Sequence, residues 1–357
     1  MNPVFDKSSY HEILCRQAPA FLEKYLSVDI LQRLAGVGLL CGTDWTPLYK
    51  NPVFYSRLEH SIGVALILWN FTHDKKQTIA GLLHDVSTPA FSHVSDFRNG
   101  DALKQESTES ENKNIIHQSL ELKALLEEDG LSCFDVDDYH RFPIADNEIP
   151  MLSADRLEYM FPSGCILNGS FSMQNIARLY GDISICYNEL GQEELGFKTQ
   201  SLAVEYCRRV CCTSHVLQKN ENKLTLQLLA EILSLGISLG IISEQDLFVF
   251  SEKQLIEKFD FIAEGKNSDS GFKKFSCLYR TFRTMKKIDR STEPEKGCFC
   301  ISLDVKQRYI NPLVALDSSA HPKGKRITEI SKEAAEIVDN FLNFQDSPFG
   351  CVKIVEN

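Results

Sequence analysis

The sequence has no long apolar run and no excess of positive charge. Its longest apolar stretch, at residues 62–69, is too short for a membrane-spanning helix, and no secretory signal pattern follows Met1. The 38 Lys and Arg residues are outnumbered by 49 Asp and Glu residues, which gives a net charge of −11. The general basic field that attracts nucleic acid is therefore missing. We expect a soluble, cytoplasmic protein that binds neither membranes nor nucleic acid.

Paired cysteine motifs are also missing. The chain has 12 cysteines, but most are isolated and no two Cys-x-x-Cys pairs occur. This spacing favours free, mostly buried thiols in a reducing compartment over a disulfide framework or a zinc site.

Helical spacing of apolar residues covers most of the 357 residues, of which 43% are hydrophobic. Ser153 is a plausible N-cap, and Pro162 and Gly164 are expected to end the helix that follows it. The predicted helices span residues 10–26, 29–37, 58–72, 77–86, 112–129, 154–161, 201–218, 223–239, 254–261, 270–285 and 328–344.

Two stretches alternate in polarity instead, which is typical of strands. Residues 181–198 contain the turn residues Asn188 and Gly191 and predict a β-hairpin. Residues 298–304 and 309–316 predict a second hairpin. The expected fold class is therefore mostly α, with a helical core and a C-terminal helical part that carries small β-hairpins.

Three of the predicted helices carry residues that suit a single metal ion. His84 and Asp85 end one apolar helix. His60 lies early in the preceding helix, and Asp155 lies at the start of a later one. Burial of an unpaired imidazole or carboxylate costs several kcal/mol, whereas together these groups bind Mn, Fe, Co, Ni or Zn, with Mg less well suited. The alternatives are a solvent-facing helix end or a buried polar network without metal.

The order His, His-Asp, Asp resembles the signature of HD-domain metal-dependent phosphohydrolases. The similarity is closest to the deoxynucleoside triphosphate triphosphohydrolase-like branch and covers roughly residues 25–165. The matching blocks, in order, are Gln-Arg-Leu at 32–34, Ser-Arg-Leu-Glu-His-Ser-Ile-Gly-Val at 56–64, Gly-Leu-Leu-His-Asp at 81–85 with Pro-Ala-Phe-Ser-His at 89–93, and Asp-Arg-Leu-Glu-Tyr at 155–159.

This resemblance implies a divalent metal ion (Mn, Ni, Co, Fe, Zn or Mg) held by His60, His84, Asp85 and Asp155. The ion would leave positions for a phosphate oxygen and a water of lowered pKa. The chain would then be an HD-superfamily phosphohydrolase that cleaves a phosphoester or phosphoanhydride bond, with a nucleotide as the favoured substrate. Residues 1–170 would form the HD-type metal-binding core, and residues 171–357 a C-terminal helical region packed on it.

The resemblance also implies which residues face the substrate. Arg57 would contact a phosphate, and Arg156 and Tyr159 would face the substrate. Thr88 stands where the triphosphohydrolases carry a histidine and related monophosphatases a glutamate. We group it with the substrate-binding residues, because a hydroxyl is a poor general acid at neutral pH. His93 matches a histidine that lines the phosphate site.

The proton-transfer residues of the relatives are replaced here, since Gln105 also stands where they carry a histidine. We therefore predict His93 and Glu106 as the catalytic side chains, and we interpret His117 as a core residue. The basic run at 321–326 either reaches over the site or forms an exposed loop. A catalytically weak nucleotide sensor and a binuclear iron oxygenase stay open as alternatives, and so does a homo-oligomer.

Overall fold

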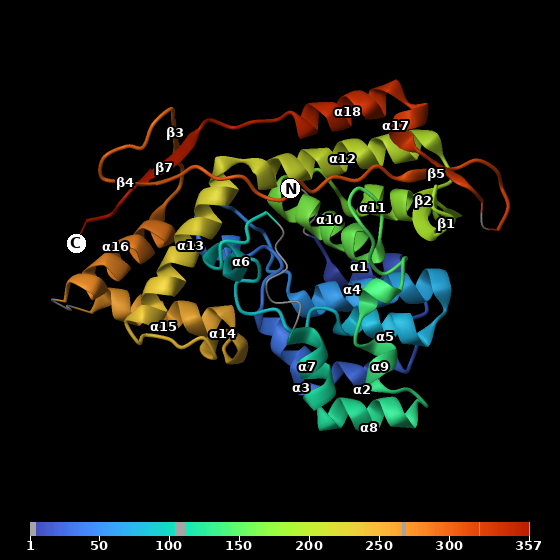
Figure 1. The fold of residues 1–357 in the computed structure, drawn as a ribbon, viewed down its shortest axis with the longest axis horizontal. Coiled ribbons are helices and arrows are strands. Elements are labelled where there is room, and N and C mark those ends of the chain that lie inside the picture. The colour runs from blue at the N-terminus through green and yellow to red at the C-terminus, as the bar shows by residue number, and fades with distance from the viewer. Residues whose placement is uncertain (1–4, 104–110, 266–268, 321, 357) are drawn as a thin grey trace.

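Most of the chain folds into helices, as the apolar spacing predicts (Figure 1). The computed structural model describes residues 5–103, 111–265, 269–320 and 322–356. The helices of the first half are α1 (Lys7–Leu14), α2 (Leu22–Leu26), α3 (Asp29–Gln32), α4 (Arg57–Thr72), α5 (Lys75–Leu83), α6 (Val94–Arg98), α7 (Glu111–Gln118), α8 (Leu120–Glu128), α9 (Cys133–Val136), α10 (Ala154–Leu167) and α11 (Met173–Tyr180), with 3-10 turns at Arg33–Gly36, Thr43–Trp45 and Tyr139–Arg141.

The second half adds longer helices and two small sheets, so the predicted fold class is confirmed. Its helices are α12 (Gln200–Gln218), α13 (Asn220–Ser238), α14 (Asp246–Val249), α15 (Glu252–Glu264), α16 (Ser270–Thr284), α17 (Ile327–Ile330) and α18 (Lys332–Leu342). Within the ranges given above, no helix is long and apolar enough to cross a membrane.

Helix α4 packs against both α5 and α10, and this packing positions the site. A capping box starts α4, because Ser56 accepts a hydrogen bond from the Glu59 backbone and Glu59 accepts one from the Ser56 backbone. Gly63 of α4 has no room for a Cβ against Glu158 of α10, and Gly81 of α5 has none against Leu68 of α4. Glycine at these two positions therefore allows α4 to approach α10 and α5 closely.

Helix α10 continues past Pro162 to Leu167, so the predicted stop at Pro162 is wrong. A proline inside a helix leaves the carbonyl four residues earlier without its usual donor. Here the Tyr10 hydroxyl, from α1, donates to the carbonyl of Glu158 at 3.3 Å. The tertiary contact thus compensates for the hydrogen bond that Pro162 removes.

Some predicted helices are divided in the structure. The stretch at 10–26 forms α1 and α2, with Pro19 between them, and the stretch at 112–129 breaks at Ser119, which caps α8. In the last predicted helix, Ser331 caps α18 after the single turn of α17, and the chain continues into a strand. In each case a residue that favours a cap or turn overrides a continuous apolar spacing.

The strands form two sheets. One sheet has the order β1-β2-β5-β6, and the other has the order β3-β7-β4. The predicted hairpin at 181–198 is confirmed as the antiparallel pair of β1 and β2. The strands are β1 (Ile183–Tyr187), β2 (Glu193–Phe197), β3 (Asp289–Ser291), β4 (Cys298–Ile301), β5 (Leu313–Ala315), β6 (Gly324–Arg326) and β7 (Phe349–Lys353).

The second predicted hairpin is wrong. Strand β4 pairs with β7, and β5 pairs with β2 and β6, so the two stretches belong to different sheets. Alternation in polarity marks a strand but does not identify its partner. Residues 302–312, which we call the strap, instead connect the two sheets without regular secondary structure (Figure 1).

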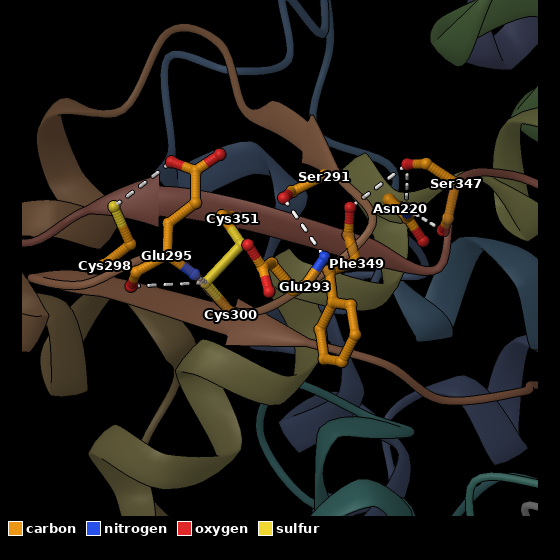
Figure 2. The surroundings of a disulfide bond; sticks show 9 residues. All are labelled: Asn220, Ser291, Glu293, Glu295, Cys298, Cys300, Ser347, Phe349 and Cys351. Atoms are coloured by element: carbon orange, nitrogen blue, oxygen red, sulfur yellow. Dashed lines mark hydrogen bonds between the residues drawn. A yellow bond between two sulfur atoms is a disulfide. The ribbon is translucent and has the colours of Figure 1, made fainter.

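The prediction of free cysteines is wrong for one pair. Cys300 of β4 and Cys351 of β7 face each other in the antiparallel register and form a disulfide (Figure 2). They are 51 residues apart in the sequence, and only strand pairing brings them together. The remaining ten cysteines, all within the described ranges, carry free thiols.

Three groups of buried side chains form the interior of the described part of the chain. The largest group draws on most helices of the first half, including α4, α5 and α10, and also on α12, α17 and α18. The second group gathers residues of α6, α13, α15 and α16. A small third group joins α12 to α18. The boundary near residue 170 between an N-terminal core and a C-terminal region stays a prediction.

Candidate metal centre

Three side chains from three helices meet at one point. His60 comes from α4, His84 directly follows α5, and Asp155 lies in the first turn of α10. The two imidazole Nε2 atoms are 3.2 Å apart. Asp155 Oδ1 lies 3.0 Å from His60 Nε2 and 3.6 Å from His84 Nε2. The structure therefore brings three of the four predicted metal ligands within 4.8 Å of one another.

Acceptors on the far side of each imidazole orient the two rings. His84 Nδ1 donates to the Gly81 carbonyl at 2.7 Å, and His60 Nδ1 bonds to the Glu158 carboxylate. Glu158 is fully buried and also accepts from the Tyr55 hydroxyl at 2.6 Å. Because each Nδ1 faces an acceptor, either ring in its neutral form would carry its lone pair on Nε2, and the two Nε2 atoms face each other.

This donor set fits a divalent cation. Two imidazole nitrogens and a carboxylate oxygen suit first-row transition metals, and an acceptor behind each ring is the usual support for a histidine ligand. Burial lowers the pKa of His60, but the carboxylates of Glu158 and Asp155 outweigh burial and raise that pKa to about 10. Burial likewise raises the pKa of Asp155, yet His60 and His84 hold it well below its usual range. The point between these groups thus attracts positive charge strongly.

Asp85 lies beside this cluster. Its Oδ2 is 3.6 Å from His84 Nε2 and 3.8 Å from His60 Nε2, and it accepts a hydrogen bond from Arg57 at 2.9 Å. Its Oδ1 accepts from the Thr88 hydroxyl at 2.9 Å. Asp85 is therefore near enough to join the ligand set, but both of its oxygens already have donors. Its role as a ligand stays a prediction.

Arg57 is buried and held in place by two contacts. Its Nη1 donates to Asp85, and its Nε donates to the Ser92 hydroxyl at 3.1 Å. Ser92 in turn donates to the Gly38 carbonyl at 2.9 Å. Glu59, which is two residues from Arg57 in the sequence, does not pair with it and instead takes part in the capping box of α4. The guanidinium is therefore fixed next to the metal ligands.

Glu252 of α15 holds the loops behind Arg57. Its buried carboxylate accepts hydrogen bonds from the backbone amides of Gly38 at 2.8 Å and Phe91 at 3.0 Å, and from Trp45 Nε1 at 2.6 Å. Phe91 and Ser92 both adopt left-handed backbone conformations, with φ of 65° and 52°, which costs energy in non-glycine residues. The helix α15 thus stabilises the unusual turn that carries Ser92.

Arg156 orders a loop at the cavity wall. Its Nε donates to the Met151 carbonyl at 2.8 Å, its Nη2 bonds to Asn147, and its Nη1 lies 3.3 Å from Asp146. The nearby Glu158 is not among these partners, because it bonds to His60 and Tyr55. Arg156 also lines the cavity. Its predicted role towards substrate therefore combines with a role in holding residues 146–151.

The other predicted side chains differ in how they relate to the cavity. His93 and Tyr159 line it. Burial lowers the pKa of His93 to about 4, despite the hydrogen bond with Asp96. His93 is therefore neutral at pH 7, which suits a proton acceptor better than a donor. The Thr88 hydroxyl is directed to Asp85, and Thr88 is not among the lining residues.

Three further sequence expectations concern Glu106 with Gln105, His117, and the basic run at 321–326. Glu106 and Gln105 lie outside the described residues. His117 bonds to Asp137 and does not line the cavity. In the basic run at 321–326, Arg326 pairs with Glu189 and Glu194, and none of its described residues lines the cavity.

The cavity beside the metal centre has a volume of about 480 Å³. Its wall includes residues that the sequence does not single out: Tyr139, Asn222 of α13, and Lys306 and Arg308 of the strap. Tyr139 also packs its ring against His84, with centroids 5.0 Å apart. No motif marks these residues, because they reach the cavity only through the tertiary fold.

No family model matches the chain. Two curated proteins are similar to part of it. "Uncharacterized protein YdhJ" of Bacillus subtilis is 31% identical over 147 residues, which cover 39% of this chain and 41% of that protein. "Metal-dependent phosphohydrolase cns2" of Cordyceps militaris is 30% identical over 146 residues, which cover 40% of this chain and 39% of that protein. The chain thus matches about two fifths of the length of these relatives.

Solved structures share the fold over nearly the whole chain. A phosphohydrolase from Bacteroides thetaiotaomicron superposes with a TM-score of 0.60 at 13% identity, over 94% of this chain and 96% of that one. A hypothetical protein from Aquifex aeolicus superposes with a TM-score of 0.61 at 16% identity, over 95% and 93%. At these identities the matches show a shared fold, and one of the proteins that share it is named a phosphohydrolase.

Proposed function

We propose that this protein is a metal-dependent phosphohydrolase that cleaves a phosphoester or phosphoanhydride bond of a nucleotide. The observation that carries the proposal is the meeting of His60 Nε2, His84 Nε2 and Asp155 Oδ1 at the wall of a cavity that also exposes Arg57. The name of the Cordyceps relative, a metal-dependent phosphohydrolase, supports the same activity.

In this proposal, His60, His84 and Asp155 hold the metal ion, with Asp85 as the fourth ligand. When bound, a divalent ion polarises a phosphoryl oxygen and lowers the pKa of a bound water. Glu158 and the Gly81 carbonyl keep both imidazoles oriented with Nε2 towards the cation. This preorganisation means that the ligands need not rearrange when the metal binds.

The chain's own residues orient the phosphate and accept protons. Arg57 is fixed by Asp85 and Ser92, so it can donate to a phosphoryl oxygen without losing side-chain entropy at that moment. Neutral His93, held by Asp96, is the candidate proton acceptor. A proton donor towards the leaving group is not supplied by Thr88, whose hydroxyl is directed to Asp85.

A nucleotide fits the mixed lining of the cavity. Its volume of about 480 Å³ is in the usual range for small-molecule sites, which is about 300–1,000 Å³. Leu39, Leu226 and Val305 provide an apolar part of the wall that a base can contact. The sequence blocks favour the triphosphohydrolase-like branch, whereas Thr88 departs from it. The products formed would therefore decide which bond is cleaved.

The test is a panel of nucleoside mono-, di- and triphosphates and simple phosphoesters, incubated with Mn, Mg, Ni or Co and resolved by mass. We expect hydrolysis that disappears in His84→Ala, together with loss of bound metal. His117→Ala, which changes a histidine outside the cavity, should keep both. Full activity in His84→Ala would refute the proposal, and tight nucleotide binding without any product would indicate a sensor instead.

A further inference from the structure

We propose that Lys306 and Arg308 of the strap form a second anion subsite in this cavity, which takes a further phosphoryl group of the substrate. The substrate class would then be molecules with two or more linked phosphates. This inference rests on the proposed function, because it assumes that the first phosphoryl group lies at the metal centre.

The strap is anchored on both sides of the two basic residues. Val305 and Ile310 are buried, one on each side of the pair. The Lys306 carbonyl accepts a hydrogen bond from Gln218 of α12 at 2.9 Å, and the Lys306 amide donates to the Ala102 carbonyl at 3.3 Å. The backbone that carries Lys306 and Arg308 is thus held against the body of the protein.

Three side chains of the strap line the cavity, namely Val305, Lys306 and Arg308. Lys306 and Arg308 both line the cavity, whereas Gln307 between them is exposed and donates to the Leu342 carbonyl of α18 at 3.1 Å. Two cationic side chains therefore enter the cavity from one short segment.

Arg308 lies beside Tyr159, which is one helical turn along α10 from the candidate ligand Asp155. Its guanidinium carbon is 5.7 Å from the centroid of the Tyr159 ring. Tyr159 follows Asp155 by four residues on α10, so the two side chains share a face about 6 Å apart. The Arg308 charge also contributes to the lowered pKa of His93, which agrees with its position in the cavity. An anion on Arg308 would therefore be a second group, beyond the one at the metal.

The two other arginines that line the cavity form ion pairs within the protein. Arg57 pairs with Asp85, and Arg156 with Asp146 and the loop that follows it. Each additional phosphate adds negative charge that the acidic residues of this cavity would oppose. The strap supplies two positive charges on the wall where a longer phosphate chain would lie, which is the charge pattern that linked phosphates require.

The test compares two non-hydrolysable probes that differ by one phosphonate group. Methylphosphonate and methylenediphosphonate are titrated calorimetrically into the full chain with constant Mn²⁺. Wild type should bind the diphosphonate about 10-fold more tightly, and Arg308→Gln should remove most of that gain while methylphosphonate binding changes less than about 2-fold. Lys306→Gln should weaken diphosphonate binding by about 3-fold or more. Exposed Lys253→Gln, which makes the same change in net charge, should bind like wild type.

Equal loss for both probes in Arg308→Gln, or no loss for either, would overturn the subsite. Arg308→Lys keeps the charge and should retain part of the gain, so a misfolded Arg308→Gln would not leave the question open. The α,β-methylene analogue of adenosine diphosphate separates the sources of linked phosphates: tighter binding than the diphosphonate indicates a nucleotide, and equal binding indicates an inorganic polyphosphate. None of these titrations depends on turnover, so failure of the hydrolysis panel and failure of the subsite are distinct results.

Discussion

Glu158→Gln is the substitution that best tests how the metal centre is held together. In the wild type, one carboxylate oxygen accepts from His60 Nδ1 and the other from the Tyr55 hydroxyl. A glutamine keeps its oxygen for His60, and the Tyr55 hydroxyl can turn to accept from the new amide. The number of hydrogen bonds is preserved, and the change is confined to the lost negative charge behind His60.

Loss of such a support usually weakens metal binding by about 10- to 100-fold, which corresponds to about 1.4–2.7 kcal/mol. The free energy of unfolding of the metal-free protein should fall by about 1 kcal/mol, because a charge-assisted hydrogen bond becomes a neutral one. Mn²⁺ affinity, measured by competition with a chelator, and urea unfolding check the two values.

Tyr55→Phe is the matched control for this experiment. It removes one hydroxyl from the same carboxylate and leaves the charge behind His60 in place, so Mn²⁺ affinity should change less than about 3-fold. If folded Glu158→Gln binds Mn²⁺ within 2-fold of wild type, the carboxylate does not tune His60 as a ligand, and the reasoning on the metal centre is wrong.

Two further predictions concern residues that support the site. Burial raises the pKa of Glu252 to about 7, so the unfolded chain loses the Glu252 proton at a lower pH than the folded protein does. The free energy of unfolding should therefore fall by about 3 kcal/mol as the pH rises from about 4.5 to 7. Urea unfolding at pH 5 and pH 8 should show a smaller loss in Glu252→Gln than in wild type, and an identical loss would contradict this assignment. Gly63→Ala would add a Cβ 2.5 Å from Glu158 Oε1. This clash should lower the free energy of unfolding by about 1–3 kcal/mol and weaken Mn²⁺ binding. If stability and Mn²⁺ affinity were both unchanged, α4 and α10 could separate freely.

The sequence can suggest candidate metal ligands because each of them lies in a short motif within a helix or at its end. His60, His84 and Asp155 need only their helices to pack together for the site to form. The helices themselves follow from apolar spacing, and α4 begins one residue from its predicted start. Local patterns therefore account for the elements and for the ligands that they carry.

The features that escape prediction depend on partners far away in the chain. Tyr10 allows α10 to pass Pro162, Cys351 pairs with Cys300, and Glu252 reaches loops more than 150 residues earlier. Each of these contacts joins two segments, and the local sequence of neither segment predicts its partner. The same holds for Lys306 and Arg308, which have no motif and enter the cavity only because the strap crosses it.

The strap has a consequence for how this protein can diverge from its relatives. The matches to the curated relatives extend over fewer than 150 residues, so neither can contain both His60 and Arg308. The residues that we propose as metal ligands and those that we assign to the substrate therefore lie on segments far apart in the sequence. Descendants of a common ancestor could keep one metal centre and exchange substrates by altering a short extended segment, and similarity around the HD motif alone would not report that exchange.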